Sequence, residues 1–140
     1  MKVLFVCRAN VSRSQTASAL FNGLSKKNTS TSAGTNVNEK EGRSISDPVT
    51  KEGEHVLNCM EDLRYDLSKA TRRQLTEKMA QEADLIVAMT DRVDLPGYVK
   101  TSPKLRLWAV PDTKGTDYEF HAKVIDQLKK KVESLVKEIG

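Results

Sequence analysis

The chain has 140 residues, of which 38% are hydrophobic and 30% charged, and its formal net charge is +4. This balance is typical of one soluble globular domain covering residues 1–140 and excludes a disordered chain. No apolar run approaches the roughly 20 residues of a membrane span, and the opening run 3–6 is too short for the core of a secretory signal, so we expect a cytoplasmic protein without a membrane partner. The aromatic content of 5% argues against a single-stranded nucleic-acid platform.

Apolar runs and amphipathic segments alternate along the chain. The run 3–6 is typical of a strand buried on both faces, and a polar loop and a helix follow it, with one face formed by Ala17, Leu20, Phe21 and Leu24. Further strands are predicted at 29–33, 85–89 and 105–110. A further helix is predicted at 71–80. Another is predicted around Val49, Val56, Leu57 and Met60, with Ser46 or Asp47 near its N-cap and Pro48 in its first turn. The C-terminal segment is predicted to be an amphipathic helix with these apolar residues on one face: Val124, Leu128, Val132, Leu135, Val136 and Ile139. Alternating strands and helices indicate an α/β fold with a mostly parallel sheet.

The chemistry of the sequence is concentrated in the loop after the first strand. It reads Cys-Arg-Ala-Asn-Val-Ser-Arg-Ser from Cys7 to Ser14 and opens a helix, whose free N–H groups and dipole attract an anion. A thiolate below a bound phosphate is placed for in-line attack, and the planar fork of Arg13 suits two phosphate oxygens. We therefore predict a phosphate cradle with Cys7 as nucleophile. The remaining residues of the cradle bind phosphate or support the loop: Arg8, Ala9, Asn10, Val11, Ser12 and Ser14.

A phosphate ester also needs a proton for its leaving group. Asp112 follows the last predicted strand, and ligands of parallel sheets bind at the carboxyl ends of the strands. Asp112 is therefore the candidate general acid, although a turn aspartate is the plain alternative. The long segment 34–48, rich in Asn, Ser and Gly, is expected to frame the pocket.

Taken together, these segments resemble the low-molecular-weight protein tyrosine phosphatases and the thioredoxin-coupled arsenate reductases of the same fold. The resemblance rests on Val6-Cys7-x-x-Asn10-x-x-Arg13-Ser14, on the segments 32–35, 72–76 and 84–89, and on the position of Asp112. It implies a four-stranded parallel sheet flanked by helices on both faces, as in phosphotyrosine protein phosphatase I. It also implies a phospho-cysteine intermediate, no metal and no cofactor, with Cys7 as nucleophile, Arg13 as phosphate clamp and Asp112 as acid and then base.

The chain departs from the family pattern at several positions. Ala9 stands where glycine is frequent, Ser12 where many members have a second cysteine, and Thr113 where proline commonly follows the acid. Arg8 adds a positive charge at the mouth. Aromatic residues that clamp phosphotyrosine in eukaryotic members have no counterpart, since no aromatic residue lies between Phe21 and Tyr65.

Three readings of function follow. The first is a low-molecular-weight, cysteine-dependent protein tyrosine phosphatase, a monomer acting on a phosphorylated protein or a small phosphoester. The second is an arsenate reductase using an external thiol, because the region after the third strand has no cysteine and Cys59 is predicted to be a helix-packing thiol. The third is a phosphate-binding module without catalysis. A zinc site is disfavoured because His55 and His121, interpreted as surface or capping residues, lack paired spacing.

Overall fold

The computed structural model of the protein describes residues 1–46 and 51–140. At its centre is a four-stranded sheet in the order β2-β1-β3-β4, with every neighbouring pair parallel. The strands are β1 (Lys2–Cys7), β2 (Thr29–Gly34), β3 (Leu85–Ala88) and β4 (Leu105–Leu107). The helices are α1 (Arg13–Leu24), α2 (Lys51–Asp62), α3 (Glu77–Glu82), α4 (Gly97–Lys100) and α5 (Tyr118–Ile139), with 3-10 turns at Asn38–Lys40 and Arg92–Asp94.

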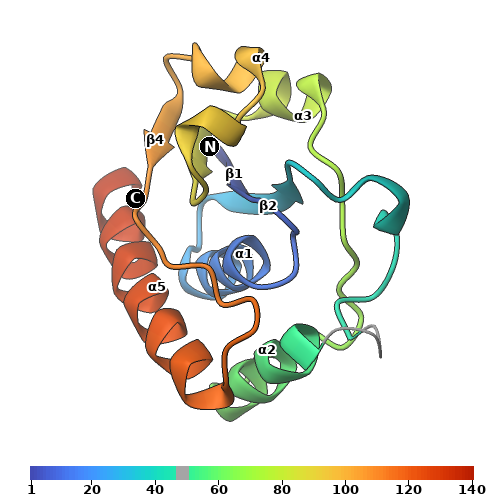
Figure 1. Ribbon diagram of the computed structural model, residues 1–140. Helices are drawn as coiled ribbons and strands as arrows, with labels where there is room; N and C mark the ends of the chain where they lie inside the picture. Colours follow the sequence, from blue (N-terminus) through green and yellow to red (C-terminus); the bar gives the residue numbers. More distant parts are fainter. Residues whose placement is uncertain (47–50) are drawn as a thin grey trace.

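Helices cover both faces of the sheet, as predicted. In Figure 1, α1, α2 and α5 lie on one side of the strands, and the short helices α3 and α4 lie on the other. The strand sequences explain this arrangement, because successive side chains of a strand point to opposite faces. Phe5 and Val87 belong to the core under the long helices, whereas Leu4 and Ile86 belong to the core under α3 and α4.

The larger core joins the sheet to α1 and α5. The ring of Phe5 lies 5.9 Å from that of Phe21 and 5.8 Å from that of Trp108, measured between centroids. The predicted C-terminal amphipathic helix is confirmed, and its buried stripe follows the expected spacing: Val124, Leu128, Val132 and Leu135. No helix within the described residues is long and apolar enough to cross a membrane.

Two predicted elements differ from the structure. The predicted strand 105–110 ends at Leu107, although the Trp108 N–H still donates to the carbonyl of Ala88 at 2.9 Å. The predicted helix 71–80 is helical only from Glu77, after Thr76 as N-cap. The preceding residues are extended because they pair with β2: the Gly34 N–H donates to the Arg73 carbonyl at 2.9 Å, and the Leu75 N–H to the Gly34 carbonyl at 2.8 Å.

Smaller corrections concern single residues. Leu24, predicted on the buried face of the first helix, is 38% exposed, because it lies in the last turn, beyond the packed part of α1. The second helix is described from Lys51. Of the residues predicted near its start, Ser46 lies in a turn, and Asp47, Pro48 and Val49 lie outside the described residues.

Candidate active site

Cys7 is the last residue of β1, and its loop leads directly into α1. The side chain is 2% exposed and therefore sits at the floor of the site. Residues 8–12 form a chain of bends, and Ser12, the N-cap residue, makes no side-chain capping hydrogen bond. The first-turn N–H groups of a helix have no partners within the helix, so those of α1 are available to an anion bound above Cys7.

The hydrogen bonds around Ser14 determine how it acts on the cysteine. Ser14 Oγ lies 2.9 Å from Cys7 Sγ and accepts a hydrogen bond of 2.7 Å from Asn10 Nδ2. The bond from Asn10 uses one lone pair of Ser14 and leaves its proton free, so Ser14 is the donor to Cys7 whenever the sulfur is a thiolate, which carries no proton. A hydrogen bond donated to sulfur favours the charged thiolate over the thiol. The predicted supporting roles of Asn10 and Ser14 fit this geometry.

Asn10 holds the loop in its unusual shape. Its φ of 55° lies in the left-handed region that Asn tolerates, whereas Ala9 is not among the residues with positive φ, so its methyl group adds no such strain. The side-chain oxygen of Asn10 accepts from the Arg73 N–H at 2.8 Å and from Gln15 Nε2 at 3.0 Å, which fixes the orientation of the amide. Its amide nitrogen also reaches Ser32 Oγ at 3.0 Å.

Several residues of the site escaped sequence reasoning. Buried Arg72 donates from Nε to the carbonyl of Ala9 at 3.0 Å. The side-chain oxygen of Gln74 accepts hydrogen bonds from the N–H groups of Val37 and Asn38 at 2.7 and 2.9 Å. Both belong to the extended segment that composition had indicated as helix. The signal that could have found them is the absence of apolar periodicity in 71–76, which is unusual for a helix packed on a sheet.

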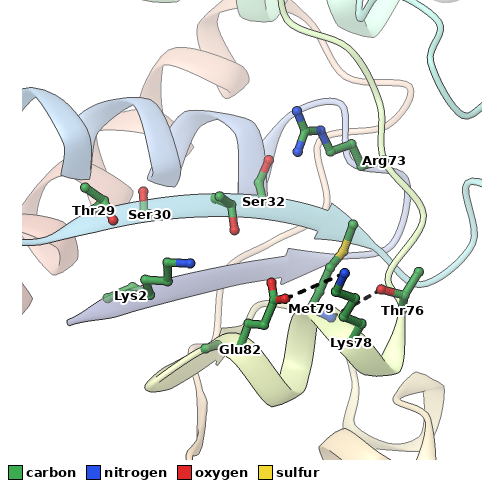
Figure 2. A pocket seen from close by; sticks show the side chains of 12 residues that line it. Lys2, Thr29, Ser30, Ser32, Arg73, Thr76, Lys78, Met79 and Glu82 are labelled. Atoms are coloured by element: carbon green, nitrogen blue, oxygen red, sulfur yellow. Dashed lines mark hydrogen bonds and ion pairs between the residues drawn. The ribbon is translucent and has the colours of Figure 1, made fainter.

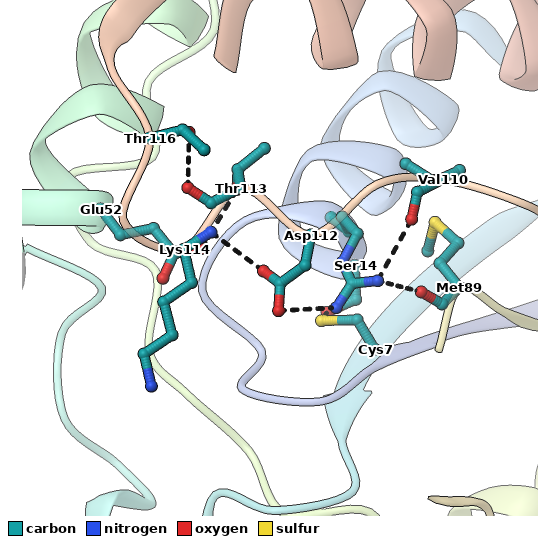
Figure 3. Close-up of polar contacts among 10 residues, drawn as sticks. Cys7, Ser14, Glu52, Met89, Val110, Asp112, Thr113, Lys114 and Thr116 are labelled. Atoms are coloured by element: carbon teal, nitrogen blue, oxygen red, sulfur yellow. Dashed lines mark hydrogen bonds and ion pairs between the residues drawn. The ribbon is translucent and has the colours of Figure 1, made fainter. Parts of the chain in front are cut away.

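Arg13 brings together the carboxyl ends of three strands. Its guanidinium donates to the Met89 carbonyl after β3 and, at 3.3 Å, to the Val110 carbonyl after β4. The other terminal nitrogen lies 3.8 Å from the carboxylate of Asp112 (Figure 3). The arginine side chain is 9% exposed and that of Asp112 54%, so the carboxylate stands at the open side of the site. The sequence predicted that these two residues meet, and the structure brings them together.

The loop of Asp112 has contacts of its own. The second carboxylate oxygen of Asp112 accepts from the Lys114 N–H at 3.0 Å, an ordinary Asx turn. Between these exposed residues, Thr113 is 1% exposed and its hydroxyl donates to Glu52 of α2 at 3.1 Å (Figure 3). Glu52 was not among the predicted site residues, since no local sequence pattern indicates that α2 lies at this edge of the sheet.

A pocket of about 360 Å³ opens above the cysteine. Cys7, Arg8, Ala9, Ser12, Arg13 and Asp112 line it, as do the following residues outside the loop: Asn36, Val37, Asn38, Glu39, Lys40, Glu52, Arg72 and Lys114. The predicted framing role of the segment 34–48 therefore holds for residues 36–40. Three loop residues do not line it: Asn10 and Ser14 are completely buried, and the side chain of Val11 belongs to the hydrophobic core.

A second hollow of about 330 Å³ lies away from this pocket, between β2 and α3 (Figure 2). Lys2, Lys78 and Glu82 rim it, and hydroxyl groups of β2 form its wall. None of the predicted site residues lines it, so it has no part in the chemistry of Cys7.

One of the two histidines, His121, is placed differently from the prediction. His121 is completely buried, and its ring centroid lies 5.0 Å from that of half-buried His55. His121 Nδ1 lies 2.8 Å from the Asp117 carbonyl, which can only accept, so this nitrogen carries the proton. The interpretation of His121 as a surface residue is wrong because α2 packs against this end of α5. In the described part of the chain, no three His, Cys, Asp or Glu side chains cluster as metal ligands.

A buried cysteine at the carboxyl end of a parallel strand, the start of a helix and a buried arginine therefore lie together at one edge of the sheet, in an arrangement that can hold an oxyanion. The chain belongs to the low molecular weight phosphotyrosine protein phosphatase family, whose pattern it matches over residues 2–140.

Three relatives illustrate the range of this family and its fold. The protein-arginine-phosphatase of Bacillus subtilis (strain 168) is 31% identical over 90 residues, a match that spans 64% of this chain and 56% of that protein. A low molecular weight protein tyrosine phosphatase from T. tengcongensis is 25% identical with a TM-score of 0.85 over 99% of each chain. An arsenate reductase in the phosphate-binding state is 26% identical with a TM-score of 0.79, over 99% of this chain and 98% of the other. The residues of the site must therefore decide between these activities.

Proposed function

We propose that the protein is a metal-independent phosphomonoester hydrolase of the protein tyrosine phosphatase type, acting through a phospho-cysteine on Cys7. The observation that carries this proposal is the 2.9 Å contact between Ser14 Oγ and Cys7 Sγ at the floor of a pocket that Arg13 and Asp112 also line. This arrangement supplies a nucleophile, an oxyanion clamp and an acid within one site.

The reaction is a double displacement. The Cys7 thiolate attacks phosphorus, an S–P bond forms, and the P–O bond to the leaving group breaks as Asp112 gives that oxygen a proton. The Arg13 guanidinium and the N–H groups at the start of α1 stabilise the equatorial oxygens. Water then attacks phosphorus and gives a proton to Asp112, the S–P bond breaks, and the thiolate and inorganic phosphate are released.

The second cysteine argues for hydrolysis over an internal redox relay. Cys59 lies in α2, is buried against the Tyr118 carbonyl at 3.8 Å, and does not line the pocket of Cys7. Burial raises the pKa of its thiol, a nearby hydrogen bond from Tyr118 opposes this, and the charge of Asp62 adds to it. A protonated, enclosed thiol is a poor partner for disulfide exchange.

The lining of the pocket bears on the choice of phosphate donor. Among the described residues it contains no aromatic side chain on which a phenol ring could stack, and it combines three acidic residues with five basic ones: Glu39, Glu52 and Asp112 beside Arg8, Arg13, Lys40, Arg72 and Lys114. The basic residues suit the phosphate group, and the carboxylates can contact a cationic leaving group. Phosphoarginine, the substrate class in the name of the Bacillus subtilis relative, is therefore the second candidate beside phosphotyrosine.

The deciding assay follows hydrolysis of phenyl phosphate by the purified protein with a chelator present, beside Cys7→Ser. We expect turnover that survives the chelator and is absent from the variant. Matched phosphotyrosine and phosphoarginine peptides then rank the two substrate classes by kcat/KM. Arsenate-driven oxidation of an external thiol without any phosphate release would contradict the proposal in favour of a reductase, and phosphate binding without either reaction would favour a binding module.

A further inference from the structure

The loop that carries Asp112 is tethered at the next residue to a helix far away in the sequence. Thr113 is almost completely buried between two exposed neighbours, and its hydroxyl donates to Glu52 Oε1 at 3.1 Å across 61 positions of the chain. Figure 3 shows Glu52 reaching from the start of α2 toward this hydroxyl, with the Asp112 carboxylate on the adjoining turn.

The main chain of Thr113 is also held by hydrogen bonds. The Thr113 carbonyl accepts from Thr116 Oγ1 at 2.6 Å and from the Thr116 N–H at 3.1 Å. Thr116 Oγ1 in turn lies 3.1 Å from Nδ1 of buried His121 in α5. Because the Thr116 proton is used toward Thr113, the protonated Nδ1 of His121 is the donor in this last contact. Thr113 is thus fixed to α2 by its side chain and to α5 through its main chain.

Asp112 itself makes few contacts that would fix it. Its carboxylate is 54% exposed and is held by one N–H within its own turn and by Arg13 at 3.8 Å. An exposed carboxylate on a turn has freedom to rotate away from the reacting oxygen, and a misplacement of about 1 Å in a catalytic group can cost a large factor in rate. The position of the backbone at Asp112 therefore depends on its neighbour Thr113.

We propose that Thr113 and Glu52 are positioning residues for the general acid: the hydrogen bond between them holds the turn so that Asp112 faces the leaving group. This inference rests on the proposed phosphatase function. Glu52 lines the same pocket as Cys7 and Asp112, so the start of α2 and the acid turn form one wall whose two halves are joined by this bond.

The test compares two leaving groups, since an acid matters most when the leaving group is basic. Phenol has a pKa of about 10, like tyrosine, and 4-nitrophenol is much more acidic. We expect Thr113→Val to lower kcat/KM for phenyl phosphate by about tenfold, a fraction of the total effect of a general acid. With 4-nitrophenyl phosphate the loss should stay within about twofold, because that leaving group departs without much help. Thr113→Ser, which keeps the hydroxyl, should restore the wild-type ratio.

Glu52 provides a second, independent set of variants at a half-buried position that folding tolerates more easily. Glu52→Ala removes the acceptor and should reproduce the leaving-group dependence of Thr113→Val. Glu52→Gln retains an oxygen acceptor and should keep the wild-type ratio. The matched control is Thr16→Val, the same change at a buried hydroxyl that has no hydrogen-bond partner among the described residues.

An Asp112→Asn background separates positioning from general stability. If Thr113 acts through the acid, Thr113→Val adds no further loss of kcat/KM once the acid is gone, so the two changes are not additive. Equal losses for both substrates, or a full additional loss in the Asp112→Asn background, would overturn the inference while the phosphatase function stands. If the wild type hydrolysed neither ester, the proposed function itself would fail, which is a different result.

Discussion

The Ser14 hydroxyl has a single proton, and the proposed reaction depends on this proton being available to the sulfur of Cys7. Ser14 is completely buried, receives a hydrogen bond from Asn10 and has one proton left for Cys7. In the proposed reaction this contact gains strength whenever sulfur carries charge, which is before attack on phosphorus and again when the thiolate leaves. A hydrogen bond to a charged group contributes about 1.5–3 kcal/mol, more than one between neutral partners.

Replacing Ser14 with Ala should therefore slow the second step in particular. We expect kcat for phenyl phosphate to fall by roughly 10- to 100-fold, the equivalent of about 1.5–3 kcal/mol for one hydrogen bond to a charged group. Because the phospho-cysteine would then accumulate, rapid mixing should show a burst of phenol before steady turnover. Ser18→Ala is the matched control, since Ser18 is a buried serine one turn later in α1, bonded to Ser30. An unchanged kcat without a burst would contradict this role.

The two cysteines should differ in reactivity. Both thiols are nearly covered, but Cys7 lines a pocket that a small reagent can enter, whereas Cys59 does not. Burial also raises the pKa of the Cys59 thiol, so the folded protein keeps it protonated to a higher pH than an ordinary thiol. Near neutral pH we expect iodoacetamide to modify Cys7 and to leave Cys59 intact, as peptide mass spectrometry would show. Labelling of Cys59 should become appreciable only at a higher pH than labelling of an ordinary exposed thiol, whose pKa is about 8.5.

Inorganic phosphate provides the control for that experiment, because it should protect Cys7 and have no effect on Cys59. The variant Cys59→Ser should lose label only at high pH. Equal labelling of both cysteines near neutral pH would show that burial does not protect Cys59 as the structure indicates.

At the scale of elements, the segments with strong hydrophobic patterns were predictable, and those defined by long-range pairing were not. The run 3–6 and the stripe of α5 are local signals, and both elements formed as expected. Residues 71–76 carry no such signal, since their extended shape comes from hydrogen bonds to β2 and to Asn10. The early end of β4 has a similar origin, because the chain after Leu107 turns toward Arg13 and no longer follows β3.

Gly34 is the point where β2 meets the phosphate loop. A Cβ atom there would lie 2.6 Å from the Arg8 carbonyl oxygen and 2.9 Å from the Asn10 nitrogen, both of which belong to the loop backbone. Gly34→Ala should therefore displace the cradle, raise KM for phenyl phosphate and lower the free energy of unfolding by about 1–3 kcal/mol, as overpacking does.

Urea denaturation and steady-state kinetics measure these two effects. Gly97→Ala is the matched control, because a Cβ at Gly97 meets nothing within 4 Å. If Gly34→Ala behaved like Gly97→Ala in both measurements, the close approach of β2 to the loop would not be needed for substrate binding.

For the whole molecule, the parallel sheet explains why residues so distant in sequence share one pocket. Cys7, Arg13 and Asp112 were predictable because carboxyl ends of parallel strands meet at one edge. The strand order and the position of α2 were not predictable from local pattern. For the same reason, neither the contact of Glu52 with Thr113 nor the burial of His121 could be predicted. These features depend on which elements pack together, which apolar periodicity leaves undetermined.

Because residues from distant parts of the chain share this pocket, we expect an oxyanion bound in it to stabilise the entire fold. Phosphate in the cradle would bind the native state only, and a ligand at 100 times its Kd adds about 2.7 kcal/mol to the free energy of unfolding. We expect inorganic phosphate to raise the Tm of the wild type by several degrees in a thermal melt, relative to chloride at equal ionic strength. Cys7→Ser should keep this increase, since it retains the cradle.

Arg13→Ala should lose the increase, because Arg13 supplies the clamp for two oxygens. That variant also lacks the bonds from Arg13 to the Met89 and Val110 carbonyls, so its Tm without phosphate will be lower. The informative quantity is therefore the change that phosphate causes within each variant. A Tm increase that persists in Arg13→Ala, or that chloride reproduces in the wild type, would mean that phosphate binds outside the cradle. An increase shared by the wild type and Cys7→Ser alone places the anion above Cys7, where the proposed attack must begin.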